Sequence, residues 1–283
     1  MVRGLYTNGW SMLAHTRKMD VIANNLANVN THGYKKETAT FGSFPELMIK
    51  RIYDVRSQLN PSARVGTVEL SADIDQNFVY FNPGPTEWTE RTLDVAIDDY
   101  EGEDNASRAR SFFTIQVNGA AGEAGAAGGA AGGAGAGAGA AELRYTRDGS
   151  FVIGADRLLR TLGGDLVLGV GGPIRLEGED FIITKDGTVL QENAVAGRLR
   201  ITSFEDPHAL RKVGGNLLAA TDASVERPFD GVLRQGYVEQ SNVNVVSEMV
   251  DMITCMRAYE ANQKMVWFID STLDKACNEV GRV

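Results

Sequence analysis

Apolar side chains recur at every third or fourth position along the C-terminal end of the chain. The members of this repeat are Val245, Met249, Met252, Met256, Tyr259, Val266 and Leu273. Their spacing predicts a helix over residues 241–283, with a seam that fits against a partner helix. Asn242 or Asn244 is suited to cap the start of this helix, because an Asn side chain accepts hydrogen bonds from the first free amides.

A second set of apolar residues lies off this seam on the same predicted helix. It consists of Val246, Val250, Ile253, Trp267 and Phe268, so apolar surface extends around most of the helix. Ordering the segment costs about 1–2 kcal/mol per residue in backbone entropy, whereas each large buried apolar side chain returns about 1.5–3 kcal/mol. One seam is too little to offset that cost, so we expect the helix to be stable among several others from neighbouring copies.

The N-terminal end of the chain carries a matching repeat. Its members are Leu5, Gly9, Met12, Thr16, Met19, Ala23 and Leu26. The repeat predicts a helix over residues 1–32. Small residues alternate with Leu and Met in this seam, so a bulkier helix can approach closely. We therefore expect the N- and C-terminal helices to pair as a coiled coil.

Asparagines crowd the end of the N-terminal helix at Asn24, Asn25, Asn28 and Asn30. Asn is disfavoured inside a helix because its amide competes for backbone groups. One interpretation is a fraying end with a left-handed cap at Asn30 or Gly33. The other is that these amides bond to the backbone or side chains of adjacent subunits. The two interpretations are compatible.

The middle of the chain has the signature of β structure. Residues 33–92 predict an extended, β-leaning connector, with a helical turn expected around Pro45 to Arg51. Short strands at regular spacing over residues 93–218 predict an antiparallel β-rich domain. Residues 219–240 then return the chain to the C-terminal helix. The predicted fold class is therefore α+β.

Turn signals within the β domain predict its hairpins. Asp148-Gly149 and Asp186-Gly187 each lie between two apolar runs, which is typical of a β-hairpin. Residues 119–141 interrupt a further hairpin with 10 Gly, 12 Ala and a single Glu. This composition predicts a flexible loop whose ends are about 26 Å apart on random-coil scaling. A stacked Gly-Ala sheet is the alternative.

Charge and length exclude several classes of protein. The chain has 283 residues and a net charge of −9, without a cluster of Lys and Arg longer than a pair, which argues against a nucleic-acid partner. No apolar run is long enough to cross a bilayer, and Met1 to Asp20 lacks the apolar centre of a secretory signal peptide. Cys255 and Cys277 both fall on the C-terminal helix, where we expect buried thiols that pack between helices.

No residue pattern in the chain indicates catalysis, a cofactor, a metal or a small-molecule substrate. His15, His32 and His208 have no companion at metal-ligand spacing. Residues 169–173 are rich in glycine, but Pro and a β-like run follow where a phosphate-binding helix would begin, so we expect a turn. The acidic pairs Asp98-Asp99 and Glu179-Asp180 are expected in solvated loops.

Three motifs in order resemble one known family. Residues 19–31 (MDVIANNLANVNT) with Gly33-Tyr34-Lys35 look like the N-terminal signature of bacterial flagellar rod and hook proteins. Residues 236–245 (GYVEQSNVNV) and 257–262 (RAYEAN) look like the C-terminal signature of that family, and residues 145–151 (YTRDGSF) are similar to its central hairpin. The resemblance covers nearly the whole chain. Residues 3–7 and 91–96 look more like the proximal rod protein than the distal one.

The resemblance implies a structural subunit of the flagellar basal-body rod. Such subunits are exported by the flagellar type III export apparatus without a cleaved signal peptide. They lie in the cell envelope outside the cytoplasmic membrane and assemble with copies of themselves and with other rod and hook proteins. The expected subunit-packing residues are Leu5, Met12, Met19, Asn24, Asn25, Leu26, Asn28, Asn242, Asn244, Val245, Met249, Met252, Met256, Tyr259, Val266 and Leu273.

Two alternatives to a rod subunit remain at this stage. The first is a hook or distal-rod paralogue of the same family. The second comes from a different class, a cell-wall carbohydrate-binding or carbohydrate-processing β domain with helical oligomerisation ends. The sequence contains no catalytic carboxylate pair that would support carbohydrate processing.

Overall fold

The chain folds into two compact units, and successive segments of the chain belong alternately to one unit and to the other. The computed structural model describes residues 2–43, 47–52, 62–69, 72–99, 109–117, 142–178, 180–191 and 194–280. The helical unit comprises Met1–Val29, Lys36–Tyr80 and Val243–Val283, and the β unit comprises Asn30–Lys35 and Phe81–Asn242. The fold is α+β, with an antiparallel β-rich body and one helix at each end of the chain, as the sequence predicts.

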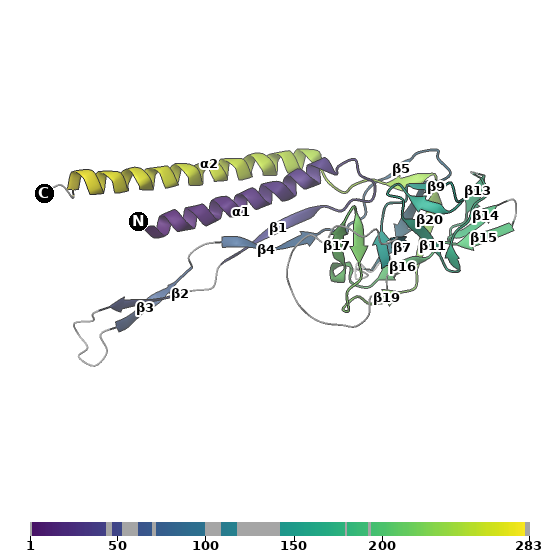
Figure 1. Ribbon diagram of the computed structural model, residues 1–283, viewed down its shortest axis with the longest axis horizontal. Coiled ribbons are helices and arrows are strands. Elements are labelled where there is room, and N and C mark those ends of the chain that lie inside the picture. The colour runs from purple at the N-terminus through teal and green to yellow at the C-terminus, as the bar shows by residue number, and fades with distance from the viewer. Residues whose placement is uncertain are drawn as a thin grey trace. The chain divides into compact units, whose positions relative to one another are not determined.

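Two long helices run side by side in the helical unit (Figure 1). Helix α1 spans Val2–Ala27, helix α2 spans Val245–Lys275, and a π-helical turn, Ala276–Val280, follows α2. Asn244 caps α2, because its side chain accepts hydrogen bonds from the amides of Val246 and Ser247. Of the two cap residues predicted, Asn244 is the one that performs this role.

A narrow β ribbon completes the helical unit. Strand β1 (Glu37–Ser43) pairs antiparallel with β4 (Ala72–Val79), and β2 (Leu47–Ile52) pairs antiparallel with β3 (Ser62–Val68). The helical turn expected around Pro45 to Arg51 is wrong where the structure describes that segment, because Leu47–Ile52 is a strand. Pairing with β3 satisfies the backbone groups of these residues in a ladder, which a local helical pattern does not anticipate.

The β unit contains the remaining strands, and every described pair of them is antiparallel. Over the residues that the structure describes, its largest sheet has 10 strands, and a 3-stranded sheet and two 2-stranded sheets accompany it. In chain order the elements are β5 (Thr86–Trp88), β6 (Val95–Asp99), β7 (Arg110–Val117), β8 (Glu142–Thr146), β9 (Phe151–Ile153), β10 (Leu159–Thr161), β11 (Leu166–Gly169), β12 (Gly172–Pro173), β13 (Phe181–Ile183), β14 (Thr188–Gln191), β15 (Ala194–Arg198), β16 (Ile201–Phe204), the 3-10 turn η1 (Pro207–Ala209), β17 (Arg211–Gly214), β18 (Leu217–Ala219), β19 (Glu226–Arg227), β20 (Gly231–Gln235) and β21 (Tyr237–Glu239).

One predicted hairpin forms and one does not. Strands β13 and β14 pair around Asp186-Gly187, with Gly187 at φ 83°, as expected. The hairpin at Asp148-Gly149 is wrong, because β8 pairs with β7 and β18 while β9 pairs with β10. Gly149 serves a close approach instead, since a Cβ there would lie 1.7 Å from the carbonyl oxygen of Val95.

Two further turn regions follow the sequence prediction. Strands β7 and β8 pair up to Val117 and Glu142, so the hairpin around the Gly/Ala tract closes, while residues 119–141 themselves lie outside the described residues. The glycine-rich residues 169–173 form the turn between β11 and β12, with Gly172 paired to Gly169. That segment therefore lacks the helix that a phosphate-binding loop requires.

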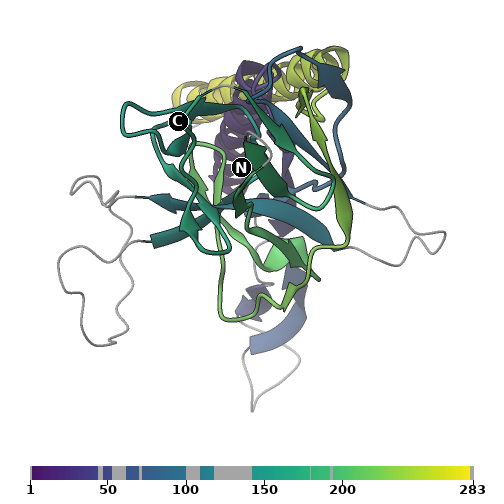
Figure 2. The ribbon, with the colours of Figure 1, turned by 90° about the vertical axis from the view of Figure 1, so that its right-hand side faces the viewer.

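The strands of the β unit surround a common apolar core rather than forming one flat sheet (Figure 2). Its fully buried side chains come from several strands and from the loop after β12, and they include Val95, Phe113, Phe151, Leu176 and Val189. Burying a side chain of this size contributes about 1.5–3 kcal/mol. The core therefore provides a rigid support for the charged residues at the edge of the unit.

Candidate functional site

Helices α1 and α2 contact each other along one face of each helix. On α2 this contact face consists of Val245, Glu248, Met252, Cys255, Tyr259, Asn262, Val266, Ile269 and Leu273, all buried or half-buried. The Cys255 thiol lies 3.3 Å from the backbone oxygen of His15, and Asn262 donates a hydrogen bond of 2.9 Å to Ser11 Oγ. Later residues of α2 thus contact earlier residues of α1, so the two helices are antiparallel.

The contact face shares the predicted period but not every predicted residue. Val245, Met252, Tyr259, Val266 and Leu273 belong to it. Met249 and Met256 are each 48% exposed, and the positions one residue earlier, Glu248 and Cys255, are buried instead. The sequence did not predict Glu248 as a packing residue, because the repeat was defined by apolar residues and Glu248 is charged. Its helical spacing, three residues after Val245, is the signal that could have found it.

The predicted positions on α1 show the same alternation. Leu5, Met12, Met19 and Leu26 are half-buried, whereas Gly9, Thr16 and Ala23 are exposed. Among the side chains of α1 whose burial the structure describes, the buried ones are those of Ala14, Ile22 and Asn25. Cys255 is a buried thiol as predicted, while Cys277 is exposed, so that part of the cysteine prediction is wrong.

A buried polar cluster joins the end of α1 to the start of α2. Asn25 and Glu248 are each 1% exposed, and Asn25 Nδ2 donates to Glu248 Oε2 at 3.0 Å. Asn25 also bonds twice to the backbone of Glu37, at 2.7 and 3.0 Å. Lys36 Nζ lies 2.5 Å from Glu248 Oε1 and balances its charge. The amide of Asn25 is therefore used inside the chain, between three of its segments.

The other predicted asparagines also make bonds within the chain. Asn28 Nδ2 donates to the backbone oxygen of Asn24 at 2.8 Å, which supports the last turn of α1. Asn242 Nδ2 donates to the backbone oxygen of Asn82 at 3.1 Å. Gly33, one of the two proposed caps, is left-handed at φ 66° but lies beyond the end of α1.

The faces of α1 and α2 that point away from this contact carry exposed apolar residues among polar ones. On α2 the large exposed apolar residues are Val246, Met249, Val250, Ile253 and Met256, followed further along by Met265, Trp267 and Phe268. Val246 is 71% exposed and Trp267 is 76% exposed. On α1 the large exposed apolar residues are Tyr6, Trp10 and Leu13. Apolar residues gathered in this way typically mark a surface that another protein covers.

A second cluster, of buried charges, lies within the β unit. Lys35 Nζ is 2.5 Å from Glu239 Oε1, Arg147 Nε is 2.8 Å from Glu239 Oε2, and Arg147 Nη1 is 2.9 Å from Asp99 Oδ2. The expectation that Asp98-Asp99 lies in a solvated loop is wrong, because both residues belong to β6 and the Asp99 side chain is only 9% exposed. Sequence order gave no signal for this cluster, since its members come from four distant segments.

Burial and neighbouring charges shift the pKa values of this cluster. Burial lowers the pKa of Lys35 to about 8, although Glu239 partly raises it again. Burial raises the pKa of Glu239, but Arg147 and Lys35 lower it by more, so that its pKa lies below the usual range. The two pKa values fall for different reasons: burial disfavours the charged lysine, with a smaller contribution from Arg147, whereas the nearby cations Arg147 and Lys35 favour the charged carboxylate.

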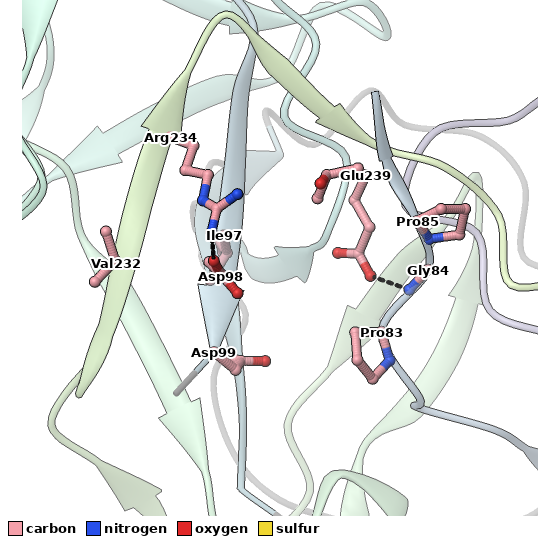
Figure 3. Close-up of a pocket in the computed structure, with 10 residues that line it drawn as sticks. Pro83, Gly84, Pro85, Ile97, Asp98, Asp99, Val232, Arg234 and Glu239 are labelled. Atoms are coloured by element: carbon pink, nitrogen blue, oxygen red, sulfur yellow. Dashed lines mark hydrogen bonds and ion pairs between the residues drawn. The ribbon is translucent and has the colours of Figure 1, made fainter. Parts of the chain in front are cut away.

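A cavity of about 540 Å³ adjoins the buried charges (Figure 3). Pro83, Gly84 and Pro85 form one wall and β6 forms the opposite wall, and Glu239 accepts a hydrogen bond of 2.9 Å from the Gly84 amide. Asp98 pairs with Arg234 at 2.5 Å. Each carboxylate that lines this cavity is thus already paired with a cation, and the arrangement supplies structural bonds rather than a free base or nucleophile.

The histidines occupy structural positions. His15 lies in α1 with its ring edge against Phe41, His32 Nδ1 lies 2.7 Å from Ser150 Oγ, and His208 lies in η1 against Phe81. Within the described residues no three His, Cys, Asp or Glu side chains are arranged to hold a metal ion. Over the same residues, no helix has the length and apolar character required to cross a bilayer.

Comparison with known proteins gives a consistent result over the whole chain. Residues 5–35 match the family "Flagella basal body rod protein", and residues 234–278 match "Flagellar basal body rod FlgEFG protein C-terminal". The chain is 31% identical to the flagellar basal-body rod protein FlgG of Borreliella burgdorferi, over 98% of each chain. It is 29% identical to FlgF of Caulobacter vibrioides, over 100% of this chain and 98% of the relative. It is 26% identical to the flagellar hook-basal body complex protein FlhO of Bacillus subtilis, over 100% of both.

Proposed function

Because the chain belongs to the family of flagellar basal-body rod proteins, we propose that its terminal helices pair as a coiled coil and assemble with neighbouring copies into the rod. The chain is a structural subunit of the flagellar basal body. Its role is mechanical and involves no catalysis. Its partners are copies of the same chain and the other rod and hook proteins.

The observation that carries this proposal is the exposed apolar face of α2. Val246, Ile253 and Trp267 are more than half exposed on a helix whose other face already contacts α1. An isolated chain gains nothing from this surface, whereas covering each such side chain contributes about 1.5–3 kcal/mol. A surface of this kind is stable in water only when further helices cover it.

The spacing of the contact face supports pairing of the helices as a coiled coil. Its members on α2, from Val245 to Leu273, alternate in steps of three and four residues, which is the heptad arrangement. On α1, Gly4 lies beside Ile269, where an added Cβ would lie 3.2 Å from the Ile269 side chain. Close approach of this kind suits two long helices in a narrow shaft.

The proposal extends to the location and export of the chain, and membership of the family supports it. We place it in the flagellar basal body, in the cell envelope outside the cytoplasmic membrane. Export by the flagellar type III apparatus without a cleaved signal peptide is part of the same proposal. Met249 and Met256, the exposed apolar residues among the predicted subunit-packing residues, are then available to neighbouring copies.

A single substitution on the exposed face tests the proposal. Met256→Asp should abolish incorporation into the basal body and motility, because a charge in an apolar helix interface is costly to bury. The β unit should stay folded, which hydrogen exchange of the purified chain would verify. Swimming in soft agar and the amount of chain in isolated basal bodies are the measurements.

Gln263→Asp is the matched control. Gln263 is exposed and follows Met256 by one heptad on the same helix, but it is already polar. The control should swim almost normally. If the Met256→Asp strain also swims, assembly does not depend on this face of α2.

A further inference from the structure

The exposed apolar residues of α1 form a short stripe near its N-terminus. Tyr6, Trp10 and Leu13 are spaced by four and three residues, and Tyr6 is 64% exposed. Further along the same side of the helix, the exposed residues at this spacing become polar, namely Arg17, Asp20 and Asn24. We call the apolar set the α1 stripe. It occupies only the first half of the helix.

The outer face of α2 is also apolar near the N-terminus of its helix. Because α1 and α2 are antiparallel, this apolar part lies toward the other end of the helix pair. Its apolar residues nearest the N-terminus of α2 are Val246, Met249, Val250, Ile253 and Met256, which we call the α2 patch. Arg257, Glu260 and Lys264 then interrupt the outer face with exposed polar side chains. Apolar residues return only at Trp267 and Phe268.

The α1 stripe and the α2 patch lie at different levels along the helix axis. Ser11 contacts Asn262 and Asn25 contacts Glu248, so Trp10 is level with residue 263 of its own chain. The α2 patch is centred near residue 251. The two levels differ by roughly 12 residues, which is about 18 Å at the helical rise of 1.5 Å per residue.

Because of this difference, a second copy that is not displaced along the helix axis brings no apolar side chains of its α1 onto the α2 patch. At that level α1 presents Arg17, Asp20 and Asn24. A second copy displaced along the helix axis by about 18 Å brings the α1 stripe onto the α2 patch instead. Apolar surface then covers apolar surface on both helices.

The net charges of the helices favour a contact of the α2 patch with α1 of a second copy rather than with α2 of a second copy. Helix α1 carries Arg3, Arg17 and Lys18 against Asp20, so its net charge is positive. Helix α2 carries five acidic and three basic residues, so its net charge is negative. Opposite charges attract across an interface, and like charges oppose a contact between two copies of α2. The antiparallel contact of α1 with α2 inside the chain is continued by the same pair of helices between chains.

We propose that the α1 stripe of one chain docks on the α2 patch of a second copy that is displaced along the helix axis by about 18 Å. The contact is head-to-tail, because each chain uses α1 toward one neighbour and α2 toward the other. Such contacts do not close on themselves at a pair, so they extend an assembly indefinitely. The inference rests on the proposed function, because it specifies which faces meet when the copies assemble.

Cysteine cross-linking in the assembled full-length chain tests the displacement. The variant carries Trp10→Cys and Ile253→Cys, with Cys277→Ser to remove the exposed native thiol, while Cys255 is buried. Oxidation should produce a ladder of covalent multimers. A mixture of chains carrying only one of the two new cysteines should give dimers, and neither chain alone should do so.

The matched control reports contact at the same level. It carries Trp10→Cys with Gln263→Cys on the same background and should cross-link several-fold less. A higher yield from this control than from Trp10→Cys with Ile253→Cys overturns the displacement. Dimers formed by the Ile253→Cys chain alone overturn the choice of α1 as the occupant.

A second pair of sites avoids any loss of apolar surface. Thr7→Cys with Thr254→Cys substitutes exposed polar residues beside the α1 stripe and the α2 patch, and Thr7→Cys with Lys264→Cys is its same-level control. The first pair should cross-link more than the second. Chains that assemble and support motility without cross-linking at either displaced pair contradict this inference alone, whereas absence of the unsubstituted chain from isolated basal bodies contradicts the proposed function.

Discussion

At the scale of single residues, Glu239 holds together distant parts of the β unit. Its carboxylate pairs with Lys35 and Arg147 and accepts a hydrogen bond from the amide of Gly84. Its backbone oxygen accepts a hydrogen bond of 2.7 Å from the amide of Gly33. One buried residue thus connects the segment after α1 to the edge of the β unit.

Removing the charge of Glu239 should be strongly destabilising. Glu239→Gln removes the carboxylate paired with buried Lys35 and leaves Arg147 with Asp99 alone, which costs about 3–5 kcal/mol. Asp98→Asn is the control, because the Arg234–Asp98 pair is half-exposed and worth about 0–1 kcal/mol. Urea unfolding of both variants gives the two free energies. Equal losses would show that the buried cluster contributes no more than a surface pair.

The pKa of Lys35 predicts a dependence of stability on pH. Burial lowers this pKa to about 8, below the usual value of 10.5. Between these values the unfolded chain binds a proton that the folded chain has released, so this lysine makes the free energy of unfolding rise with pH. Lys35→Met should remove that rise. Unfolding measured at several pH values from 8 to 10 checks this, and an unchanged slope in Lys35→Met would contradict it.

At the scale of elements, glycine decides how β6 and β9 approach each other. Gly149 precedes β9 and lies against the backbone of Val95 in β6, with the Val95 amide donating to the Gly149 oxygen at 3.0 Å. No side chain fits between the two backbones. The Asp-Gly pair that predicts a hairpin turn is therefore used to bring two strands of different sheets together.

Gly149→Ala should accordingly destabilise the β unit. A Cβ would meet the Val95 oxygen at 1.7 Å, and because that atom belongs to the backbone the strands must move apart. We expect a loss of about 3 kcal/mol, at the upper end of the usual cost of overpacking. Gly171→Ala, where nothing lies within 4 Å of the new Cβ, is the control. Thermal unfolding should separate the two variants, and similar midpoints would refute the close-approach explanation.

At the scale of the whole molecule, the two units of the chain are stabilised in different ways. The β unit buries a large apolar core of its own. In the helical unit the described buried apolar residues are few, including Ala14, Ile22, Ala39 and Cys255, while large side chains of α2 remain exposed. The helical unit therefore depends on neighbouring molecules for part of its stability.

Assembly should consequently increase helical order. In the separate chain only one face of α2 is covered by other residues, so the amides of α2 should exchange faster than those of the β unit. On assembly the helical circular dichroism signal and the protection of α2 amides should both rise, because neighbours cover the second face. Full protection of α2 before assembly would contradict the view that neighbouring copies complete this helix.

Much of the fold is readable from short-range pattern. The two helices, the cap at Asn244, the hairpin at Asp186-Gly187 and the turn at residues 169–173 all depend on residues within a few positions of one another. Such features are local because helix period and turn geometry are set by neighbouring residues. The three motifs in order also identify the family before any coordinates are considered.

Only the tertiary structure decided which residues of each helix and strand contact residues that are distant in the sequence. The apolar repeat of α2 has the predicted period, but buried Glu248 and Cys255 rather than Met249 and Met256 contact the rest of the helical unit, because Asn25, Lys36 and His15 lie opposite them. The pairing of Lys35, Asp99, Arg147 and Glu239, the strand at Leu47–Ile52 and the role of Gly149 were equally hidden. A single sequence determines the period of each element, whereas the phase and partners of that element are set by contacts between residues far apart in the chain.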